Sequence, residues 1–471
     1  MKKSLILLFI LSTFFGFTQE DEVPPMEPHH HEHSLTEDPY HEHPKCEKLM
    51  DVFKSGYMAG RVRYYFMNTN HTQHGENYYA NAIGGALAYH TAVYYGFSAG
   101  LSGIFVYNIG SSHFHDTLLS VSELELFDVT HPENRNDLDR LEELYIAYEW
   151  KKNKIKYGKQ DVSTPLVNMQ DTRMKPYVFK GIWGNFWITE STTFNAGWFT
   201  EASPRSTTHW YPIAEAIGLY GEGQSTTGLP SDYQGFLSSK GMGILGLEDH
   251  RRNLNSQAWF YHINNILNTY YLQFDYQIPL QHYALITGIQ GVYQQPHNKG
   301  GSPDGTHVYY DPTQTTTLVS GRLGFKTPHQ TYTVNATTIS NSGRFIFPRE
   351  FGREQFYTTL PRGRIEGLGG ASQLVLKAET EKLFDEKFNG FIAFGRTFTP
   401  GRTNFELNKY ATADYDHFAA NLLFKPRMEE EEGLTIRLLY VLFSAYHLPK
   451  NPSPDFHKQY HQINLIANIK F

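Results

Sequence analysis

The sequence has almost no cysteine, no long apolar run beyond its first residues, and few charged residues. Its one cysteine, Cys46, cannot form an internal disulfide, which excludes a disulfide-stabilised scaffold. No apolar stretch after residue 17 could span a bilayer as a helix, which excludes a helical membrane protein. Charged residues make up 19% of the chain, below the roughly 25% usual in soluble domains. The HExxH motif is also absent, which argues against the zinc-dependent class of hydrolase.

Aromatic residues and glycine are abundant instead. Aromatics make up 15% of the sequence, with 32 tyrosines, 33 phenylalanines and 39 glycines. A chain of 471 residues could form two or three soluble domains or one large closed sheet. This composition favours a membrane β-barrel over a soluble enzyme.

The N-terminal residues divide into two segments. Two lysines precede an apolar run from Leu5 to Phe17, as in a secretory signal, so we expect residues 1–18 to be a signal peptide. Residues 19–50 are acidic, proline-containing and rich in histidine, a composition that predicts disorder. We expect a single domain, the barrel, over residues 51–471.

Alternating polarity predicts β-strands in the remainder of the chain. In the final segment HQINLIANIKF, Ile463, Leu465 and Ile469 share one face, whereas Gln462 and Asn464 lie on the other. The segment NTYYLQFDYQI alternates in the same way. A soluble β-sandwich also alternates, but here the apolar face is rimmed by aromatics and the polar face is too hydrophilic for a packed core. This pattern is typical of a barrel with lipid outside and water inside.

We count about eighteen such segments. Short polar turns alternate with long irregular stretches, as in outer-membrane barrels with periplasmic turns and extracellular loops. The fold class predicted is therefore all-β, a single transmembrane antiparallel β-barrel of about 18 strands. The segments begin near Phe53, Tyr79, Tyr94, Leu141, Lys154, Phe179, Thr193, Ala214, Gln257, Thr269, His282, Thr317, Thr331, Ala371, Lys387, Phe418, Leu434 and His461.

Four long stretches are the predicted extracellular loops. They cover His113 to Arg140, Gly221 to Ser256, Gln295 to Thr315, and Ser340 to Gly370. We expect the first two to fold inward and narrow the channel.

Two arginines on the first predicted strand indicate which face is the lumen. In FKSGYMAGRVRYYF, Arg61 and Arg63 share one face, while Val62, Tyr64 and Phe66 share the other. An arginine facing lipid at mid-depth costs about 2–4 kcal/mol, so the arginines should point into the lumen.

A second basic cluster lies in RFIFPREFGREQFYTTLPRGRIEGLG, residues 344–369. Arginines in a row on a lumen wall would give a carboxylate several weak sites in sequence. The alternative is that they brace loops by pairing with Glu350, Glu354 and Glu366. The arginines concerned are Arg349, Arg353, Arg362 and Arg364.

This stretch resembles the FPREWGR…PR.RNEG signature of the OprD-type outer-membrane porins. A second stretch, IKYGKQDVSTPLVNMQDTRMKPYVFKGI from Ile155, resembles another segment of that family. The resemblance implies an eighteen-stranded barrel whose pore is narrowed by loops and carries small carboxylate-bearing nutrients along a basic ladder. The ladder positions are then Arg61, Arg63, Arg349, Arg353, Arg362 and Arg364, with Arg173 of DTRM as a further candidate.

The second stretch departs from the family in its basic residues. Lys156 and Lys159 stand where the family pattern has arginines, so the charge is kept but the bidentate fork is lost. In the same stretch Asp161 and Asp171 are predicted either to form an acidic wall for the cationic end of a solute or to cap a turn.

Histidines in the predicted disordered segment suggest a second hypothesis. These side chains could chelate zinc, copper or nickel, although their spacing shows no fixed tetrahedral set. The alternative is a solvated tail without a specific ion. The residues are His29, His30, His31, His33, His41 and His43.

We therefore predict a non-enzymatic channel in the outer membrane of a Gram-negative bacterium, for facilitated diffusion of small carboxylate-bearing or zwitterionic solutes. A metal or metal-chelate uptake barrel is the alternative function, and an outer-membrane hydrolase is less favoured. No cofactor is expected. The expected partners are the solutes, outer-membrane lipid and lipopolysaccharide, in a monomer or loose trimer. Nucleic acid is excluded because the basic residues alternate along strands and do not form an exposed patch.

Overall fold

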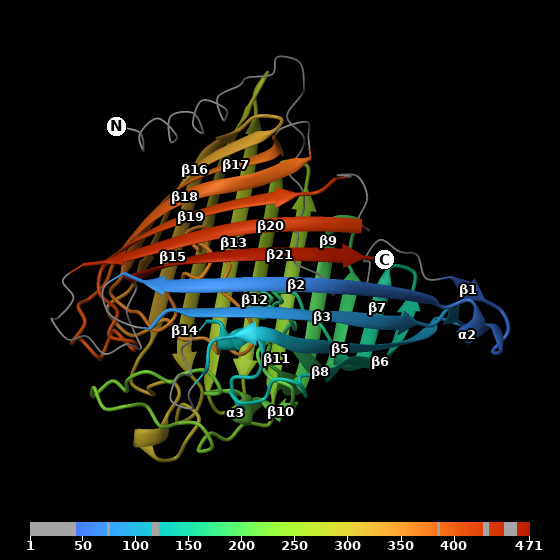
Figure 1. Ribbon diagram of the computed structural model, residues 1–471, viewed down its shortest axis with the longest axis horizontal. Helices are drawn as coiled ribbons and strands as arrows, with labels where there is room; N and C mark the ends of the chain where they lie inside the picture. Colours follow the sequence, from blue (N-terminus) through green and yellow to red (C-terminus); the bar gives the residue numbers. More distant parts are fainter. Residues whose placement is uncertain (1–43, 73–75, 115–121, 384–386, 427–432, 447–458) are drawn as a thin grey trace.

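The computed structural model describes residues 44–72, 76–114, 122–383, 387–426, 433–446 and 459–471. Within these residues, eighteen long strands form one sheet in which every long strand is antiparallel to both neighbours. The first and last of them, β2 (Tyr57–His71) and β21 (Gln459–Lys470), pair with each other and close the sheet into a barrel (Figure 1). The predicted fold class is confirmed.

The other long strands follow the chain around the barrel. Because they tilt, the strands at the front of Figure 1 cross those behind them. They are β3 (Tyr78–His90), β5 (Phe97–Ser111), β6 (Arg140–Trp150), β7 (Asn153–Gln160), β8 (Val178–Trp187), β9 (Thr192–Ser203), β11 (Met242–Arg251), β12 (Leu254–Ile263), β13 (Leu267–Pro279), β14 (Ala284–Pro296), β15 (Thr316–Lys326), β16 (Gln330–Ile339), β17 (Ser372–Leu383), β18 (Phe388–Phe398), β19 (Tyr415–Phe424) and β20 (Gly433–Ala445).

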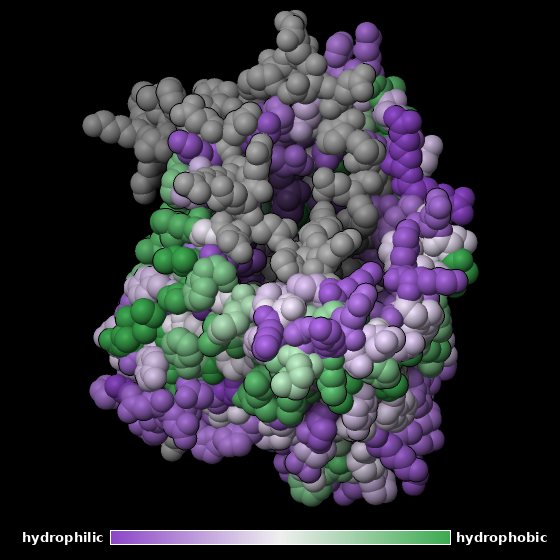
Figure 2. Space-filling view, turned by 90° about the vertical axis from the view of Figure 1, so that its right-hand side faces the viewer, coloured by the Kyte–Doolittle hydropathy of each residue, from purple (hydrophilic) through white to green (hydrophobic). Residues whose placement is uncertain are grey.

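The two faces of each strand meet different surroundings. On β13, Leu272 and Phe274 are 50% and 49% exposed on the outer face, whereas Gln273 and Asp275 are buried on the inner face. Hydrophobic residues gather on the outer surface in Figure 2, and hydrophilic residues line a hollow. The alternation therefore separates a lipid-facing wall from a polar interior, as predicted.

Connections differ in length at the two ends of the barrel. β6 and β7 are joined by a two-residue turn, and β11 and β12 likewise, whereas the opposite ends carry the long connections 112–139, 161–177, 204–241, 297–315, 340–371 and 399–414. The first and last barrel strands begin and end on the short-turn side. There, β1 (Lys45–Cys46) pairs in parallel with β4 (Val93–Tyr94), and α2 (Asp51–Lys54) leads into β2.

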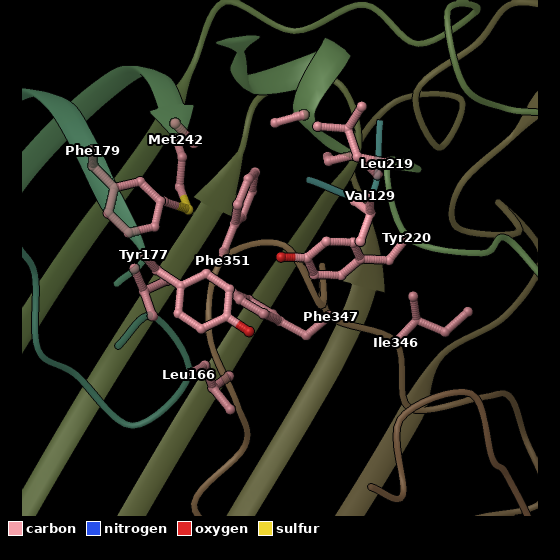
Figure 3. Packing of buried hydrophobic residues seen from close by; sticks show 14 of the residues in the cluster. Val129, Leu166, Tyr177, Phe179, Leu219, Tyr220, Met242, Ile346, Phe347 and Phe351 are labelled. Carbon is pink, nitrogen blue, oxygen red and sulfur yellow. The ribbon is translucent and has the colours of Figure 1, made fainter. Parts of the chain in front are cut away.

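Several long connections fold into the barrel and form a hydrophobic cluster there. Figure 3 shows Tyr177, Phe347 and Phe351 among the packed side chains of this cluster. Phe351 also meets Phe179 of β8 edge to face, at 5.8 Å between ring centroids. Burial of these rings holds connections 161–177 and 340–371 inside the barrel.

The strand prediction was wrong at one place. The segment expected to begin near Ala214 is instead the short helix α3 (Ile213–Ala216), preceded by the two-residue strand β10 (Tyr211–Pro212). The missing strand, β11, lies inside the predicted loop Gly221 to Ser256. Among the described residues, no helix is long and apolar enough to cross a membrane.

Of the two loops expected to fold inward, one does so and the other does not. The described part of the loop His113 to Arg140 turns Leu124, Leu126 and Phe127 inward, where they are buried. Residues 221–241 are instead mostly exposed or half-buried. The inward positions are taken by residues 213–220, which directly precede them, because these are the apolar residues of that connection.

Candidate functional site

Arginines from three connections meet at one carboxylate, Asp171, inside the barrel. Asp171 and Arg173 come from connection 161–177, Arg205 from 204–241 and Arg362 from 340–371. Arg173 and Arg362 each donate to Oδ1 of Asp171, and Nη1 of Arg205 lies 3.2 Å from Oδ2. The three guanidiniums are nearly fully buried, with side-chain exposures of 2 to 4%. We call Asp171, Arg173, Arg205 and Arg362, together with Glu125, the arginine cluster.

Glu125 is the second carboxylate of the arginine cluster. Its Oε2 accepts from Nη2 of Arg205 at 2.5 Å and from Nη2 of Arg173 at 2.9 Å. Sequence reasoning missed both Glu125 and Arg205, because neither lies in a strand or in a stretch that resembles a family motif. Only the folded connections bring them together.

Arg362 joins the arginine cluster to the barrel wall. Its Nε donates to Gln462 at 2.7 Å, and its Nη2 donates to Asn464 at 2.8 Å and to the hydroxyl of Tyr65 at 2.7 Å. These partners lie on the inner faces of β2 and β21, the strands that close the barrel. The position of Arg362 is therefore held by both loop and wall.

Asp171 stays ionised in this setting. Burial would raise the pKa of its carboxyl, but the positive charges of Arg362, Arg205, Arg353 and Arg364 outweigh burial and lower the pKa to about 2. Because the carboxylate is shared among several guanidiniums, positive charge remains in excess around it.

Asp171 and Arg362 both have left-handed backbone conformations, with φ of 59° and 66°. Such values are uncommon for residues other than glycine and cost energy, especially for a bulky side chain like arginine. The strain is held by the ion pair between the two residues and by the wall contacts of Arg362.

The other arginines of residues 344–369 do not form a ladder on a strand, because this connection is not a strand. Arg364 pairs with Glu354 at 3.2 Å and donates to the carbonyl of Gly352. Arg353 donates to the carbonyls of Leu360 and Gly363 in the same connection. These contacts match the loop-bracing alternative considered from the sequence.

The glutamates expected to brace the loop have divided roles. Arg349 lies 3.9 Å from Glu366 and over the ring of Tyr410 at 5.2 Å. Glu350 instead accepts from the backbone N–H groups of Gly218 and Tyr220, both at 3.0 Å. It therefore ties connection 340–371 to connection 204–241.

Arg61 and Arg63 lie on the inner face of β2, as predicted, with Val62 exposed on the outer face. Nη2 of Arg61 donates to the carbonyl of Met174 at 3.3 Å, and Arg63 donates to the carbonyl of Arg173 and to Asn468. The two wall arginines thus hold the segment that presents Arg173.

Lys156, Lys159 and Asp161 lie apart from these contacts. Lys156 is 4.0 Å from Asp161 and lies over the ring of Tyr145, at 4.5 Å from its centroid. Lys159 lies over the ring of Trp210 at 4.4 Å. Asp171 does not form a separate acidic wall with Asp161, because it pairs with arginines of the cluster.

The histidine hypothesis falls outside what the structure describes. His29, His30, His31, His33, His41 and His43, together with the predicted signal peptide, lie outside the described residues. Metal binding by this tail remains a prediction.

Comparison with known proteins gives consistent matches. A family model described as outer membrane porin, OprD family, matches residues 129–335, which include the motif that starts at Ile155 but not residues 344–369. No curated protein is a significant match to the sequence.

Solved structures match over most of the chain. OpdK of Pseudomonas aeruginosa, determined with vanillate, has a TM-score of 0.68 at 12% identity and covers 89% of this chain and 99% of its own. OccD3 (OpdP) of the same species has a TM-score of 0.66 at 14% identity, with coverages of 89% and 92%. OccAB1 of Acinetobacter baumannii has a TM-score of 0.67 at 11% identity, with coverages of 89% and 97%. At these identities the likeness concerns the fold.

Proposed function

We propose that the chain is an outer-membrane porin of the OprD type and that it admits small solutes bearing a carboxylate past the arginine cluster. A porin of this family is a non-enzymatic channel in the outer membrane, so the match argues against the hydrolase alternative. The proposal concerns which solutes pass and which residues select them.

An excess of positive charge where the inward connections meet carries the proposal. Charge-assisted hydrogen bonds from guanidinium groups are the strongest that a carboxylate solute can form, and arginine keeps its charge at any working pH. Five guanidiniums gather there against three carboxylates. The cations are Arg173, Arg205, Arg353, Arg362 and Arg364, and the anions are Glu125, Asp171 and Glu354.

Three of these arginines also have an N–H group left over. The Nε atoms of Arg173, Arg205 and Arg353 are buried without a hydrogen-bond partner among the described residues. Buried donors of this kind are costly unless an acceptor reaches them. A carboxylate in transit would supply that acceptor for a short time, which suits a site that must also release its solute.

The structure of OpdK and the charges of the arginine cluster both favour anionic solutes over zwitterionic solutes. OpdK was determined with vanillate, which is a carboxylate. Asp171, expected to receive the cationic end of a solute, already accepts from Arg173, Arg205 and Arg362. It therefore offers little to an ammonium group.

The test is single-channel recording in planar bilayers with benzoate and the neutral benzamide as probes. We expect benzoate, but not benzamide, to block the current. Replacing Arg362 by alanine should weaken the block about ten-fold or more, as loss of a charge-assisted hydrogen bond implies. R362K should fall between the two, because lysine keeps the charge without the fork.

The matched control is R251A, which removes an exposed arginine paired with Asp249 at the short-turn end. It should leave the block unchanged, which excludes a general effect of net charge. Equal block by benzoate and benzamide in the native channel would refute selection for carboxylates.

A further inference from the structure

Two of the long connections are joined outside the arginine cluster, around the buried side chain of Asp128. Backbone N–H of Val129 donates to the carbonyl of Ser206 at 2.9 Å, and the hydroxyl of Thr208 donates to Oδ2 of Asp128 at 2.7 Å. Asp128 has no exposed surface. Connections 112–139 and 204–241 thus meet at one carboxylate on the extracellular side of the barrel.

The carboxylate is fixed by hydroxyl groups from both connections. Oδ1 of Asp128 accepts from the backbone N–H of Thr130 at 2.9 Å and from its hydroxyl at 2.5 Å. Oδ2 of Asp128, which accepts from Thr208, also lies 3.5 Å from Nδ1 of His131.

The same two hydroxyls orient two histidines. The Thr130 hydroxyl lies 3.0 Å from Nδ1 of His131, and the Thr208 hydroxyl lies 2.9 Å from Nδ1 of His209. Each hydroxyl gives its one proton to Asp128, so each Nδ1 must be the donor in these contacts. The lone pair of each neutral imidazole is then on Nε2, free to bind a metal ion.

This arrangement has the chemistry of a transition-metal site. One ligand atom from each of Asp128, His131 and His209 lies within 4.8 Å of the other two. Two imidazoles and a carboxylate suit zinc, copper or nickel, and histidine ligands commonly donate their second ring N–H to an outer partner, as both do here. Both rings are exposed, with centroids 6.0 Å apart, so small rotations can bring the nitrogens to a common ion.

We propose that Asp128, His131 and His209 bind one divalent transition-metal ion at the extracellular mouth, and that the ion clamps connections 112–139 and 204–241 together. The clamp lies close in sequence to the arginine cluster, because Glu125 is three residues before Asp128 and Arg205 is three residues before Thr208. Metal binding would therefore stiffen the segments that carry the Glu125–Arg205 ion pair.

The experiment is zinc titration of the folded barrel in detergent by calorimetry. The six N-terminal histidines, His29 to His43, are first replaced by alanine in every variant, so that the tail does not contribute. We expect one zinc ion per chain in this background and loss of that ion in H131A/H209A. Both rings are exposed, so the double variant should keep its fold, which circular dichroism checks. H282A, which removes an exposed histidine of a short turn, is the matched control and should keep the site.

Two further measurements separate a built site from surface histidines. T130V/T208V leaves the three ligands in place but removes their orienting hydroxyls, and should weaken zinc binding about 10- to 100-fold. Amide exchange over residues 124–130 and 204–209 should slow on zinc addition, and not in H131A/H209A. Equal zinc binding in H131A/H209A and H282A would overturn the site, and unchanged exchange on zinc binding would overturn the clamp. Neither readout depends on solute transport, so the proposed carboxylate selectivity stands or fails separately.

Discussion

At the scale of single residues, Asp171 sets how much positive charge the arginine cluster presents. Replacing it by asparagine removes one negative charge, and asparagine tolerates the left-handed φ of 59°. We expect D171N to shift the reversal potential in a salt gradient toward anions. The control is D232N, since Asp232 has a side-chain exposure of 70% and lies in the outer part of connection 204–241. A shift of equal size in both variants would contradict a special role for Asp171.

Glu123 gives the site a pH dependence near neutrality. Burial raises the pKa of its carboxyl to about 7, although the hydroxyl of Thr69, which donates at 2.5 Å, opposes that rise. As pH rises through 7, Glu123 gains a negative charge that partly offsets Arg362, so block by benzoate should weaken. E123Q should abolish this step in a pH series of block constants. For folding, the raised pKa contributes stability that is complete below about 4.5 and lost as pH rises through about 7.

Some residues of the arginine cluster could be identified from the sequence, whereas others could not, because their partners lie in distant parts of the chain. Arg362, Asp171 and Arg173 stand in stretches that resemble family motifs, so they could be identified as candidates. Arg205 and Glu125 could not, because their pairing depends on two connections folding into the barrel from strands far apart in sequence. Arg362 and Arg364 were also expected to follow one another along a ladder on the lumen wall, but residues 340–371 form an irregular connection in which Arg362 bonds to the wall and Arg364 pairs with Glu354.

At the scale of elements, connection 340–371 folds into the barrel, where its backbone at Gly352 lies close to the backbone of connection 161–177. Gly352 has φ of 151°, and a Cβ there would lie 2.7 Å from the backbone nitrogen of Asn168 and 2.8 Å from the carbonyl oxygen of Leu166. G352A must therefore separate connections 340–371 and 161–177, because backbone cannot yield as a side chain can. We expect a larger single-channel conductance and weaker benzoate block.

The matched control for that substitution is G291A on β14. A Cβ at Gly291 would meet nothing within 4 Å, so conductance and block should stay as in the native channel. Native conductance in G352A would show that this contact does not hold connection 340–371 in place.

Strand β11 shows why one element escaped prediction. Its sequence MGILGLEDHR contains Gly243 and Gly246, which interrupt the apolar alternation. In the barrel, the rings of Trp198 and Trp259 from neighbouring strands lie against these glycines and supply the missing side-chain surface. Part of the side-chain surface at β11 therefore comes from neighbouring strands, so the sequence of β11 alone does not show a strand pattern.

At the scale of the whole molecule, the barrel was predictable because lipid acts on every strand in the same way. Each strand alternates with period two between one medium outside and another inside, and this repeats around the sheet. The packing of the connections inside the barrel has no such regularity. The hydrophobic cluster of Tyr177, Phe347 and Phe351 is formed by irregular connections, whose packing is set by tertiary contacts alone.

The lipid-facing wall can be tested at Leu272, at the middle of β13. Its side chain is 50% exposed on the outer face, between Ala258 and Gly291 on the adjacent strands. L272R should lower the free energy of unfolding by about 2–4 kcal/mol, measured by denaturant titration of the barrel in lipid vesicles, because a guanidinium at the bilayer midplane loses hydration. The same substitution at Leu280, which is 42% exposed in the turn after β13, should cost about 0–1 kcal/mol because that turn is close to the interface. Equal losses at both positions would mean that the outer face of β13 is not buried in acyl chains.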